Sequence, residues 1–513
     1  MQEKVDRFRE IREQVRRPAP PGTVKEGNIP RLGARAMIGQ LLDEGTFTEI
    51  NMLAKHRCTD FGMENKGALG DSVITGYGKI AGRPVFLYVQ DATVMGGSLG
   101  AAHARKIAGV MDMAAKAGAP VIGLCDSAGA RIQEGTDALA GYGEIFYRNT
   151  RYSGVIPQIT GIMGISAGGA VYSPAITDFV VQADKTGYMF ITGPAIIKEV
   201  MGQDITMDEL GGAHVHTQVT GSADFFAATQ AEALVLIRRL MSYLPQNNLS
   251  GVPRVEPRSP VKEPDPGLLS LLPASSKRGF DMRRIIGRLV DDGEFMEVKA
   301  DFARSVIVGF GRFDGWTAGI VANQPQVFAG VLDSDSTDKA ARFVRFCDAF
   351  NIPLVNLVDI PGFMPGVQEE YKGIIRHGAK LLYAYAEATV PKITVIIRKA
   401  YGGAYIAMCS KHLGADLVLA WPTAEIAVMG PEGAVKVIFK KELAQAQDPE
   451  KTRQDRIKEY EDKFANPYDA AFKMHIDDVI DPSETRIRII SALEILAAKK
   501  QEGIFKKHGN IPL

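Results

Sequence analysis

The chain has 513 residues, of which 46% are hydrophobic and 23% are charged, and its 60 basic residues balance 60 acidic ones. This length and apolar content predict a globular protein with more than one domain. A net charge of zero provides no field that attracts nucleic acid or an anionic membrane, which argues against nucleic acid as a partner.

The four cysteines lie far apart and form no Cys-x-x-Cys pair. Their spacing argues against a zinc ribbon and against a disulfide framework, and we predict no metal site. No uninterrupted run of about 18 apolar residues is present, so we expect no membrane span. The first ten residues mix acids with bases and lack the apolar core of a signal peptide, so a reducing cytoplasm is the expected location.

Strand and helix signals alternate along both halves of the chain. Apolar strands are predicted over residues 85–89, 121–125, 158–165, 317–321, 354–358 and 392–397. Helices are predicted over residues 102–117, 221–244 and 337–350, with an exposed and charged helix pair over 440–461. This alternation is typical of an α/β fold with buried, largely parallel sheets.

A proline-rich stretch separates the two halves. Seven prolines fall between Pro245 and Pro273, and this density removes backbone donors and suits neither a helix nor a central strand. We therefore predict an N-terminal domain over residues 1–250, a proline-rich linker over 251–275 and a C-terminal domain over 276–513.

The two halves repeat each other at a nearly constant offset. Equivalent positions lie 233, 234 or 237 residues apart, the offset growing along the chain: Lys106 and Lys339, Asp126 and Asp359, Gly129 and Gly362, Gly168-Gly169 and Gly402-Gly403, and Gly193-Pro194 and Gly430-Pro431. Duplication followed by small loop insertions leaves this pattern, whereas chance matches would scatter.

Each half carries a Gly-Gly pair between an apolar strand and a run of small, helix-compatible residues: Gly168-Gly169 and Gly402-Gly403. Glycine lets the backbone turn sharply and lets a ligand approach closely. Amides at the start of a helix point outward with the positive end of the dipole and can stabilise a developing oxyanion. Losing one such donor typically costs ~3–4 kcal/mol of barrier. The alternative is that these glycines only allow tight packing between helix and strand.

Two further loops follow apolar strands, where α/β folds place their ligands. Residues 126–135 contain Ala128, Gly129 and Ala130, and residues 359–366 contain Gly362 and Phe363. Asp126 and Asp359, which open these loops, could instead cap helices or hold turns.

His214 and His216 have no evident carboxylate or cysteine partner, so we expect them in a surface loop rather than in a metal site.

Common catalytic motifs are missing from the sequence. It contains no GxSxG elbow, HExxH helix, Walker A loop or GxGxxG loop after a strand, and no acid–base dyad stands out. Any chemistry must therefore use backbone donors together with groups that a substrate or cofactor brings.

Ordered motifs in both halves resemble the carboxyltransferase subunits of biotin-dependent acyl-CoA enzymes. This family includes the β chain of propionyl-CoA carboxylase, the central subunit of transcarboxylase and the α chain of methylmalonyl-CoA decarboxylase. The motifs lie at residues 167–178, 189–194, 208–213, 244–248, 322–325, 359–366, 376–380, 398–405 and 424–430. The resemblance implies an α/β fold of tandem duplicated crotonase-like domains, each a spiral of ββα units.

The same resemblance implies the reaction and its site. A carboxyl group moves between biotin and the α-carbon of a short-chain acyl-CoA such as propionyl-CoA/methylmalonyl-CoA, or acetyl- or butyryl-CoA. The amides of Gly168 and Gly169 would hold the thioester oxygen, and those of Gly403 and Ala404 the ureido oxygen of biotin, which would act as the base. The other residues implied to line the site are Ala128, Gly129, Ala130, Ala167, Gly362, Phe363, Tyr401, Gly402 and Ile406.

The partners follow from what the sequence lacks. No Met-Lys-Met biotin acceptor and no ATP-binding half are present, so the resemblance implies biotin on a separate carrier protein. The wider partner would be a biotin carboxylase subunit or a membrane decarboxylase subunit, and the direction of the reaction stays open. Family members implied to prefer propionyl groups carry an acidic residue where this chain has Ile406. Acyl-CoA on one protomer would meet biotin at the C-terminal half of another, within a hexamer.

Two alternatives belong to other classes of protein. A crotonase-type hydratase or hydrolase would act on CoA thioesters without biotin, and it would need carboxylates at the oxyanion site. A non-catalytic CoA-binding scaffold would not need intact glycine pairs in both halves.

Overall fold

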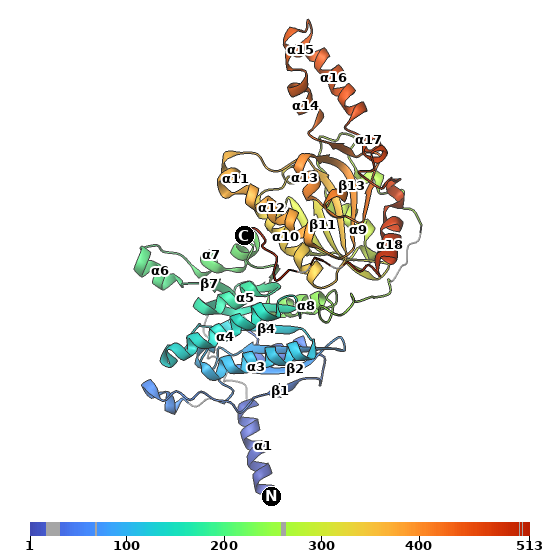
Figure 1. Cartoon of the computed structure of the whole chain (residues 1–513). Helices are drawn as coiled ribbons and strands as arrows, with labels where there is room; N and C mark the ends of the chain where they lie inside the picture. Colours follow the sequence, from blue (N-terminus) through green and yellow to red (C-terminus); the bar gives the residue numbers. More distant parts are fainter. Residues whose placement is uncertain (17–30, 67–68, 258–262, 502, 505) are drawn as a thin grey trace. The chain divides into compact units, whose positions relative to one another are not determined.

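The computed structural model of the protein describes residues 1–16, 31–66, 69–257, 263–501, 503–504 and 506–513 (Figure 1). The chain divides into two compact units, Met1–Ser250 and Gly251–Leu513. Among the described residues, each unit is built on one eight-stranded sheet. Two antiparallel pairings open each sheet, and parallel pairings follow. The predicted fold class, α/β with largely parallel sheets, is confirmed.

The first unit has the strand order β1-β2-β3-β4-β5-β6-β8, with β7 beside β5. Its elements are α1 (Gln2–Arg16), α2 (Ala34–Leu41), β1 (Thr48–Ile50), η1 (Asp60–Asn65), β2 (Val73–Ile80), β3 (Arg83–Gln90), η2 (Met95–Gly97), α3 (Ala101–Ala117), β4 (Val121–Ser127), η3 (Ile132–Glu134), α4 (Thr136–Tyr152), β5 (Gln158–Ala167), η4 (Gly168–Val171), α5 (Tyr172–Ile176), β6 (Phe179–Ala183), β7 (Tyr188–Phe190), α6 (Pro194–Met201), α7 (Met207–Gly211), η5 (Val215–Val219), β8 (Phe225–Ala227) and α8 (Gln230–Met241).

The second unit has the strand order β16-β14-β13-β12-β11-β10-β9, with β15 beside β13. Its elements are η6 (Leu269–Leu271), α9 (Met282–Leu289), η7 (Asp291–Gly293), β9 (Met296–Val298), β10 (Val306–Phe313), β11 (Trp316–Asn323), η8 (Phe328–Gly330), α10 (Ser334–Ala349), β12 (Leu354–Ile360), α11 (Val367–Lys372), α12 (Ile374–Glu387), β13 (Lys392–Tyr401), α13 (Gly402–Ala407), η9 (Lys411–Leu413), β14 (Leu417–Ala420), β15 (Glu425–Ala427), α14 (Pro431–Ile438), α15 (Lys440–Gln445), α16 (Pro449–Lys463), α17 (Pro467–Phe472), β16 (Asp478–Val479), η10 (Pro482–Glu484) and α18 (Thr485–Leu496).

Local sequence explains where these elements begin and end. The central strands β4, β5, β12 and β13 are buried along nearly their whole length, as expected for parallel strands covered on both faces. Helix α10 begins at a capping box in which Asp333 and Ser336 satisfy each other's backbone amides. Helix α3 ends at Gly118, whose φ of 61° is the left-handed conformation that glycine adopts readily.

The six predicted strands and the helices over 102–117 and 337–350 are confirmed as β3, β4, β5, β11, β12, β13, α3 and α10. The charged helix pair is confirmed as α15 and α16, which extend away from the sheet of their unit together with α14 (Figure 1).

The helix predicted over 221–244 is wrong in its first part. Strand β8 occupies Phe225–Ala227 and pairs with β6, where the backbone of Phe225 lies opposite Val181. The helix of this region, α8, begins only at Gln230, because the Thr229 side chain caps its first turn by accepting the amide hydrogen of Glu232.

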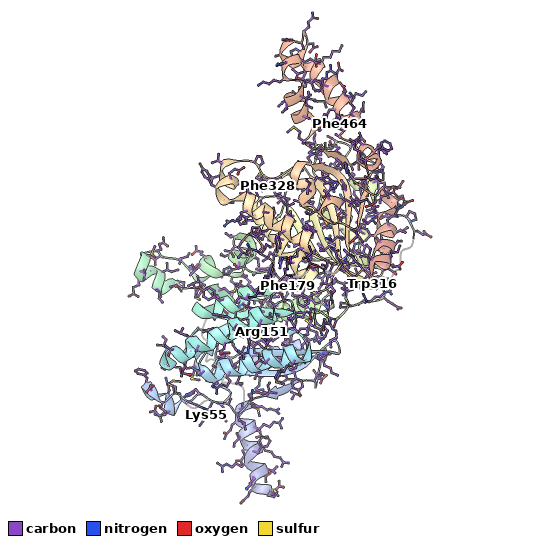
Figure 2. The ribbon with its side chains drawn as sticks, in the orientation of Figure 1. Lys55, Arg151, Phe179, Trp316, Phe328 and Phe464 are labelled. Atoms are coloured by element: carbon purple, nitrogen blue, oxygen red, sulfur yellow. The ribbon has the colours of Figure 1, made fainter. Side chains whose placement is uncertain are left out.

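The proline-rich stretch over 251–275 includes residues 258–262, which lie outside the described residues. From Gly251 onward the described chain belongs to the second unit. Arg254 forms a β-bridge with Trp316, which is labelled in Figure 2. The Arg254 guanidinium stacks 4.9 Å above the Trp316 ring. Leu268 is fully buried in the core of that unit. Within the described ranges, every helix falls short of the length or the apolar content that crossing a membrane requires.

Candidate functional site

Three glycine turns meet at one edge of the sheet in the first unit. The amide of Ala128 donates to the carbonyl of Gly96 at 3.0 Å, and that of Leu99 donates to the carbonyl of Gly129 at 2.9 Å. A Cβ added to Gly129 would lie 2.9 Å from the carbonyl oxygen of Ala167, so this loop packs directly against the end of β5. The structure therefore brings the predicted residues 128–130 next to the Gly-Gly turn.

The turn at Gly168 and Gly169 joins β5 to η4. Gly168 has φ = 60°, a conformation that L side chains rarely adopt, so the turn requires glycine at this position. The amides of a first helical turn have no intrahelical acceptor, which leaves those of Gly168 and Gly169 available to a ligand. The ring of Tyr142 on α4 packs against the turn, since a Cβ on Gly169 would lie 3.0 Å from it. Burial raises the pKa of Tyr142.

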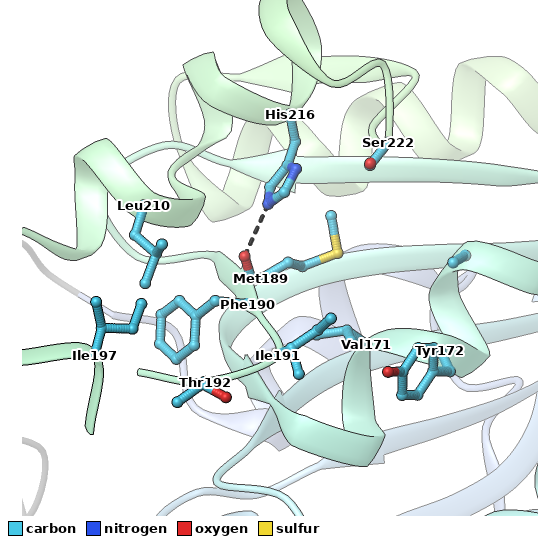
Figure 3. Close-up of a pocket in the computed structure, with 11 residues that line it drawn as sticks. Val171, Tyr172, Met189, Phe190, Ile191, Thr192, Ile197, Leu210, His216 and Ser222 are labelled. Atoms are coloured by element: carbon cyan, nitrogen blue, oxygen red, sulfur yellow. Dashed lines mark hydrogen bonds between the residues drawn. The ribbon is translucent and has the colours of Figure 1, made fainter. Parts of the chain in front are cut away.

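An apolar pocket of about 490 Å³ lies beside this turn (Figure 3). Val171, Tyr172 and Ala175 line it from η4 and α5, and Met189, Phe190, Ile191 and Thr192 from β7 and the segment after it. The carbonyl oxygen of Ile191 would be 3.9 Å from a Cβ on Gly168, so the pocket adjoins the glycine turn. An apolar cavity with a few polar groups at its edge is the usual form of a small-molecule site.

His216 lies on the wall of this pocket, which corrects the expectation of a surface loop (Figure 3). It belongs to η5, a single π-helical turn, and its Nε2 lies 2.8 Å from the carbonyl oxygen of Met189. Since a carbonyl only accepts, Nε2 carries the proton, and Nδ1 lies 2.9 Å from the hydroxyl oxygen of Thr220. Burial lowers the pKa of His216. The side chain therefore fixes the end of β7 rather than binding a metal.

The second unit repeats the arrangement with different side chains. Gly402 has φ = 58°, like Gly168, and a Cβ on Gly403 would have no atom within 4 Å. The amide of Leu332 donates to the carbonyl of Gly362 at 3.2 Å, and Leu332 also forms a bridge with Phe363. The ring of Phe363 packs against Gly378 of α12. In the preceding turn, η8, Phe328 is 68% exposed (Figure 2).

Tyr401 and Ile406 flank the second Gly-Gly turn. The Tyr401 hydroxyl donates a short hydrogen bond to the carboxylate of Glu425 on β15. Burial and this carboxylate raise the pKa of Tyr401. Ile406 is 40% exposed on α13, and Ala404 is buried. The pairing of Ile360 with Ala400 brings the loop that holds Gly362 and Phe363 to the end of β13, next to this turn.

Asp126 and Asp359 form ion pairs in place of the helix caps that we considered from the sequence. Asp126 lies 2.5 Å from the guanidinium of Arg31, and Asp359 lies 2.8 Å from that of Arg398. Arg31, Tyr142 and Glu425 were missed because they come from segments remote in sequence.

Across the described part of the chain, no group of three His, Cys, Asp or Glu side chains is arranged to hold a metal ion.

Comparison with known proteins identifies the family. The model of the carboxyl transferase domain matches residues 28–511. The α subunit of methylmalonyl-CoA decarboxylase from Propionigenium modestum is 54% identical over 483 residues, which cover 94% of this chain and 93% of that protein. The carboxyltransferase subunit of propionyl-CoA carboxylase from Haloferax mediterranei is 53% identical over 514 residues, and the match covers 100% of both chains.

A solved structure agrees with these relatives. The transcarboxylase 12S structure, described as a hexamer assembly with methylmalonyl-coenzyme A bound, has a TM-score of 0.97 and 50% identity, with coverage of 100% of this chain and 98% of that chain. This likeness confirms the predicted tandem crotonase-like fold. The protein is a member of the carboxyl transferase family, as its motifs predicted.

Proposed function

We propose that the chain is the carboxyltransferase that moves a carboxyl group between biotin on a carrier protein and the α-carbon of a short-chain acyl-CoA. The observation that carries the proposal is the pair of equivalent Gly-Gly turns, each with a glycine at positive φ and each following a strand whose last residues pair with the strand that leads into the neighbouring loop. Relatives named for propionyl-CoA and methylmalonyl-CoA support this choice of substrate.

The first unit is proposed to bind the acyl-CoA. Removing a proton from the α-carbon places negative charge on the thioester oxygen, and the amides of Gly168 and Gly169 would stabilise that charge. The neighbouring apolar pocket would receive the acyl group and exclude water from it. Ala128, Gly129, Ala130 and Ala167 surround this turn.

The second unit is proposed to receive biotin. The open space around Gly403, where a Cβ would meet no atom within 4 Å, fits a flat ureido ring placed against the amides of Gly403 and Ala404. Bound biotin would supply the carboxyl group and the basic nitrogen that accepts the α-proton. Tyr142 and Tyr401 beside the turns are protonated at neutral pH, as tyrosines ordinarily are, and burial raises the pKa of both further, so neither phenol offers a base.

The assembly is also part of the proposal. Transcarboxylase 12S is described as a hexamer, and another relative is named a biotin-dependent acetyl-/propionyl-coenzyme A carboxylase subunit. We propose a homo-oligomer, with a hexamer as its expected form, in which acyl-CoA on one protomer meets biotin held by the second unit of another. A biotin carrier protein would deliver the biotin, with a biotin carboxylase or a membrane decarboxylase subunit as the wider partner.

Biotin dependence tests the function directly. The purified chain, given methylmalonyl-CoA and free biotin, should release CO2 and form propionyl-CoA, and omitting biotin should abolish turnover. Equal rates with and without biotin would reject the proposal in favour of a biotin-independent crotonase-type hydrolase. No turnover under either condition, with CoA thioesters still bound, would favour a non-catalytic scaffold.

Substitutions at the glycine turns test the site. Gly168→Val and Gly403→Val should each lower turnover by at least about 100-fold, because the new side chain covers the amides that hold the oxygen. Gly143→Val is the matched control, since Gly143 lies on α4 with no atom within 4 Å of its Cβ position and should retain activity. Normal activity in Gly403→Val, with normal circular dichroism, would remove those amides from the mechanism.

A further inference from the structure

The repeat between the two units extends further toward the N-terminus of each than the glycine motifs do. Helix α2 corresponds to α9 at an offset of 248 residues. At that offset the ion pair between Arg35 and Glu49 recurs between Arg283 and Glu297. The register is therefore fixed by matching contacts as well as by matching elements.

With the offset of 248 residues for the segments at α2 and α9, and of 234 residues for β5 and β13, an arginine and a glycine exchange places between the units. The first unit has Arg31 before α2 and Gly164 within β5. The second has Gly279 before α9, which is the position of Arg31, and Arg398 within β13, which is the position of Gly164. Both arginines bind the equivalent aspartate. The same ion pair is thus made from two different segments.

In the first unit, the room beside Gly164 of β5 is occupied by Arg31, which precedes α2 and does not belong to the sheet. A Cβ on Gly164 would lie 1.9 Å from Oδ1 of Asp126 and 2.4 Å from Nη2 of Arg31, so β5 leaves the room that the guanidinium occupies. Gln230 holds the incoming segment, because it accepts from the amide of Leu32 at 2.6 Å and donates to the carbonyl of Met163 at 2.7 Å.

In the second unit, the segment before α9 has no room for a side chain, and the arginine comes from strand β13. A Cβ on Gly279 would lie 2.5 Å from the carbonyl oxygen of Pro325, so no side chain fits there. Arg398 reaches Asp359 from the strand, and its guanidinium donates to the carbonyl of Arg278 at 3.0 Å. It also stacks 4.7 Å above the ring of Phe280. The ion pair is almost completely buried, with side-chain exposures of 5% and 1%.

Each ion pair lies where a site loop leaves its strand. The ladder between β4 and β5 shifts register between Cys125 and Ser127, and Asp126 is the residue between them. The ladder between β12 and β13 shifts in the same way around Asp359. Asp126 and Asp359 are also tied through their amides, which donate to side-chain oxygens on β3 and β11 respectively. Each aspartate is therefore held at the strand end from which its loop leaves, residues 127–130 in the first unit and 360–363 in the second.

We propose that each unit of this carboxyltransferase positions its substrate loop with an aspartate–arginine clamp, Asp126–Arg31 for the acyl-CoA and Asp359–Arg398 for biotin. Each arginine is a positioning residue that fixes the loop and cancels a carboxylate charge at the strand end from which that loop leaves. Burial raises the pKa of Asp359, as expected for a carboxylate that depends on its counter-charge. The assignment of a substrate to each clamp rests on the proposed function.

Kinetics separate the two clamps. Arg31→Met should lower kcat/KM for methylmalonyl-CoA at saturating biotin by at least about tenfold, and leave the KM for biotin within about twofold. Arg398→Met should raise the KM for biotin by at least about tenfold and leave that for methylmalonyl-CoA within about twofold. Arg35→Met and Arg283→Met, which remove the equivalent ion pairs away from the loops, are the matched controls and should leave both KM values unchanged.

A double variant tests the charge. Because Arg31→Met removes the guanidinium charge that lies 2.5 Å from the Asp126 carboxylate, Arg31→Met/Asp126→Asn should recover most of the lost activity, and Arg31→Lys should retain more activity than Arg31→Met. Losses that simply add in the double variant would show that the charge is not involved.

Hydrogen exchange tests the clamps independently of any activity. Arg31→Met should speed amide exchange at residues 127–130 only, and Arg398→Met at residues 360, 362 and 363 only, since Pro361 has no amide hydrogen. Unchanged exchange in those loops, or equal effects of both variants on both substrates, overturns the clamps. Turnover by the wild-type chain that is equally fast without biotin would instead overturn the proposed function. The hydrogen-exchange result would still show whether each arginine fixes its loop.

Discussion

A buried polar side chain in the first unit, His103, forms its hydrogen bonds away from solvent. His103 on α3 is fully buried, with Nδ1 3.0 Å from the Ser72 hydroxyl and Nε2 3.3 Å from the Gln90 amide nitrogen. Burial lowers its pKa well below the ordinary value, and the nearby charges of Arg131 and Lys106 lower it further. His103 is therefore neutral in the folded protein at pH values where the unfolded chain is already protonated.

This difference predicts acid sensitivity. As the pH falls below about 6.5, the unfolded state binds a proton that folded His103 does not, so the free energy of unfolding should fall by about 1.4 kcal/mol per pH unit. His103→Gln should reduce this slope in urea unfolding between pH 7 and pH 5, and His508→Gln, at an exposed position, should leave it unchanged. An unchanged slope in His103→Gln would contradict the assignment.

The glycine turns were predictable at this scale, whereas the clamps were not. Gly168 and Gly402 stand where φ is positive, so local backbone geometry alone selects the residue type and leaves a mark in the sequence. Arg31 is 95 residues from Asp126, and nothing local marks it as a partner. Only the reciprocal arginine and glycine, visible once α2 and α9 are aligned, could have revealed the pair.

At the scale of elements, one buried lysine in each unit ties a helix to the start of the hairpin below it. Lys339 of α10 donates to the carbonyls of Lys299, Phe302 and Val306 at 2.7–2.8 Å. Lys106 of α3 donates to the carbonyls of Gly70 and Val73. These lysines recur at the offset of 233 residues, so the duplicated sequence preserved a structural contact as well as the glycine turns.

Removing such a lysine leaves buried acceptors without donors. Lys339→Met should lower the free energy of unfolding by about 3–5 kcal/mol, because three carbonyls lose their hydrogen bonds, and Lys106→Met should cost less because two do. Lys116→Met, at an exposed position in the last turn of α3, is the control and should change it by less than about 0.5 kcal/mol. Equal stability of Lys339→Met and wild type in urea unfolding would contradict this role.

Strands and long helices were predictable because their apolar periodicity is local. The region of residues 221–244 was not, because β8 has only three residues and owes its conformation to pairing with β6. Its residues Phe225, Phe226 and Ala227 are followed by helix formers, so the local signal favoured a helix throughout. Tertiary pairing decided the conformation of this short segment.

At the scale of the whole molecule, the proposed site takes one glycine turn from each of two protomers, which predicts complementation. In a mixed pair, the Gly168→Val protomer still offers an intact second unit, and the Gly403→Val protomer an intact first unit. One of the two sites in such a pair is then fully wild type. Co-expressing the two inactive variants should restore about a quarter of wild-type turnover if pairs form at random.

Separately purified variants that are mixed without subunit exchange should remain inactive, which serves as the control. No recovery after co-expression, in oligomers shown by differently tagged chains to contain both variants, would mean that both turns serve one site within a single protomer.

The exchanged arginine and glycine also limit how the two halves can be recombined. A chimaera that joins the leading segment of the first half to the central strand of the second would carry two guanidinium groups for one carboxylate. The opposite chimaera would carry none, and its acid would have to be buried without a counterion. The two halves have equivalent elements, but these elements are no longer interchangeable. Exchanging one element between the halves should therefore disrupt the strand–loop junction, unless the position before the first helix and the position on the central strand are exchanged together.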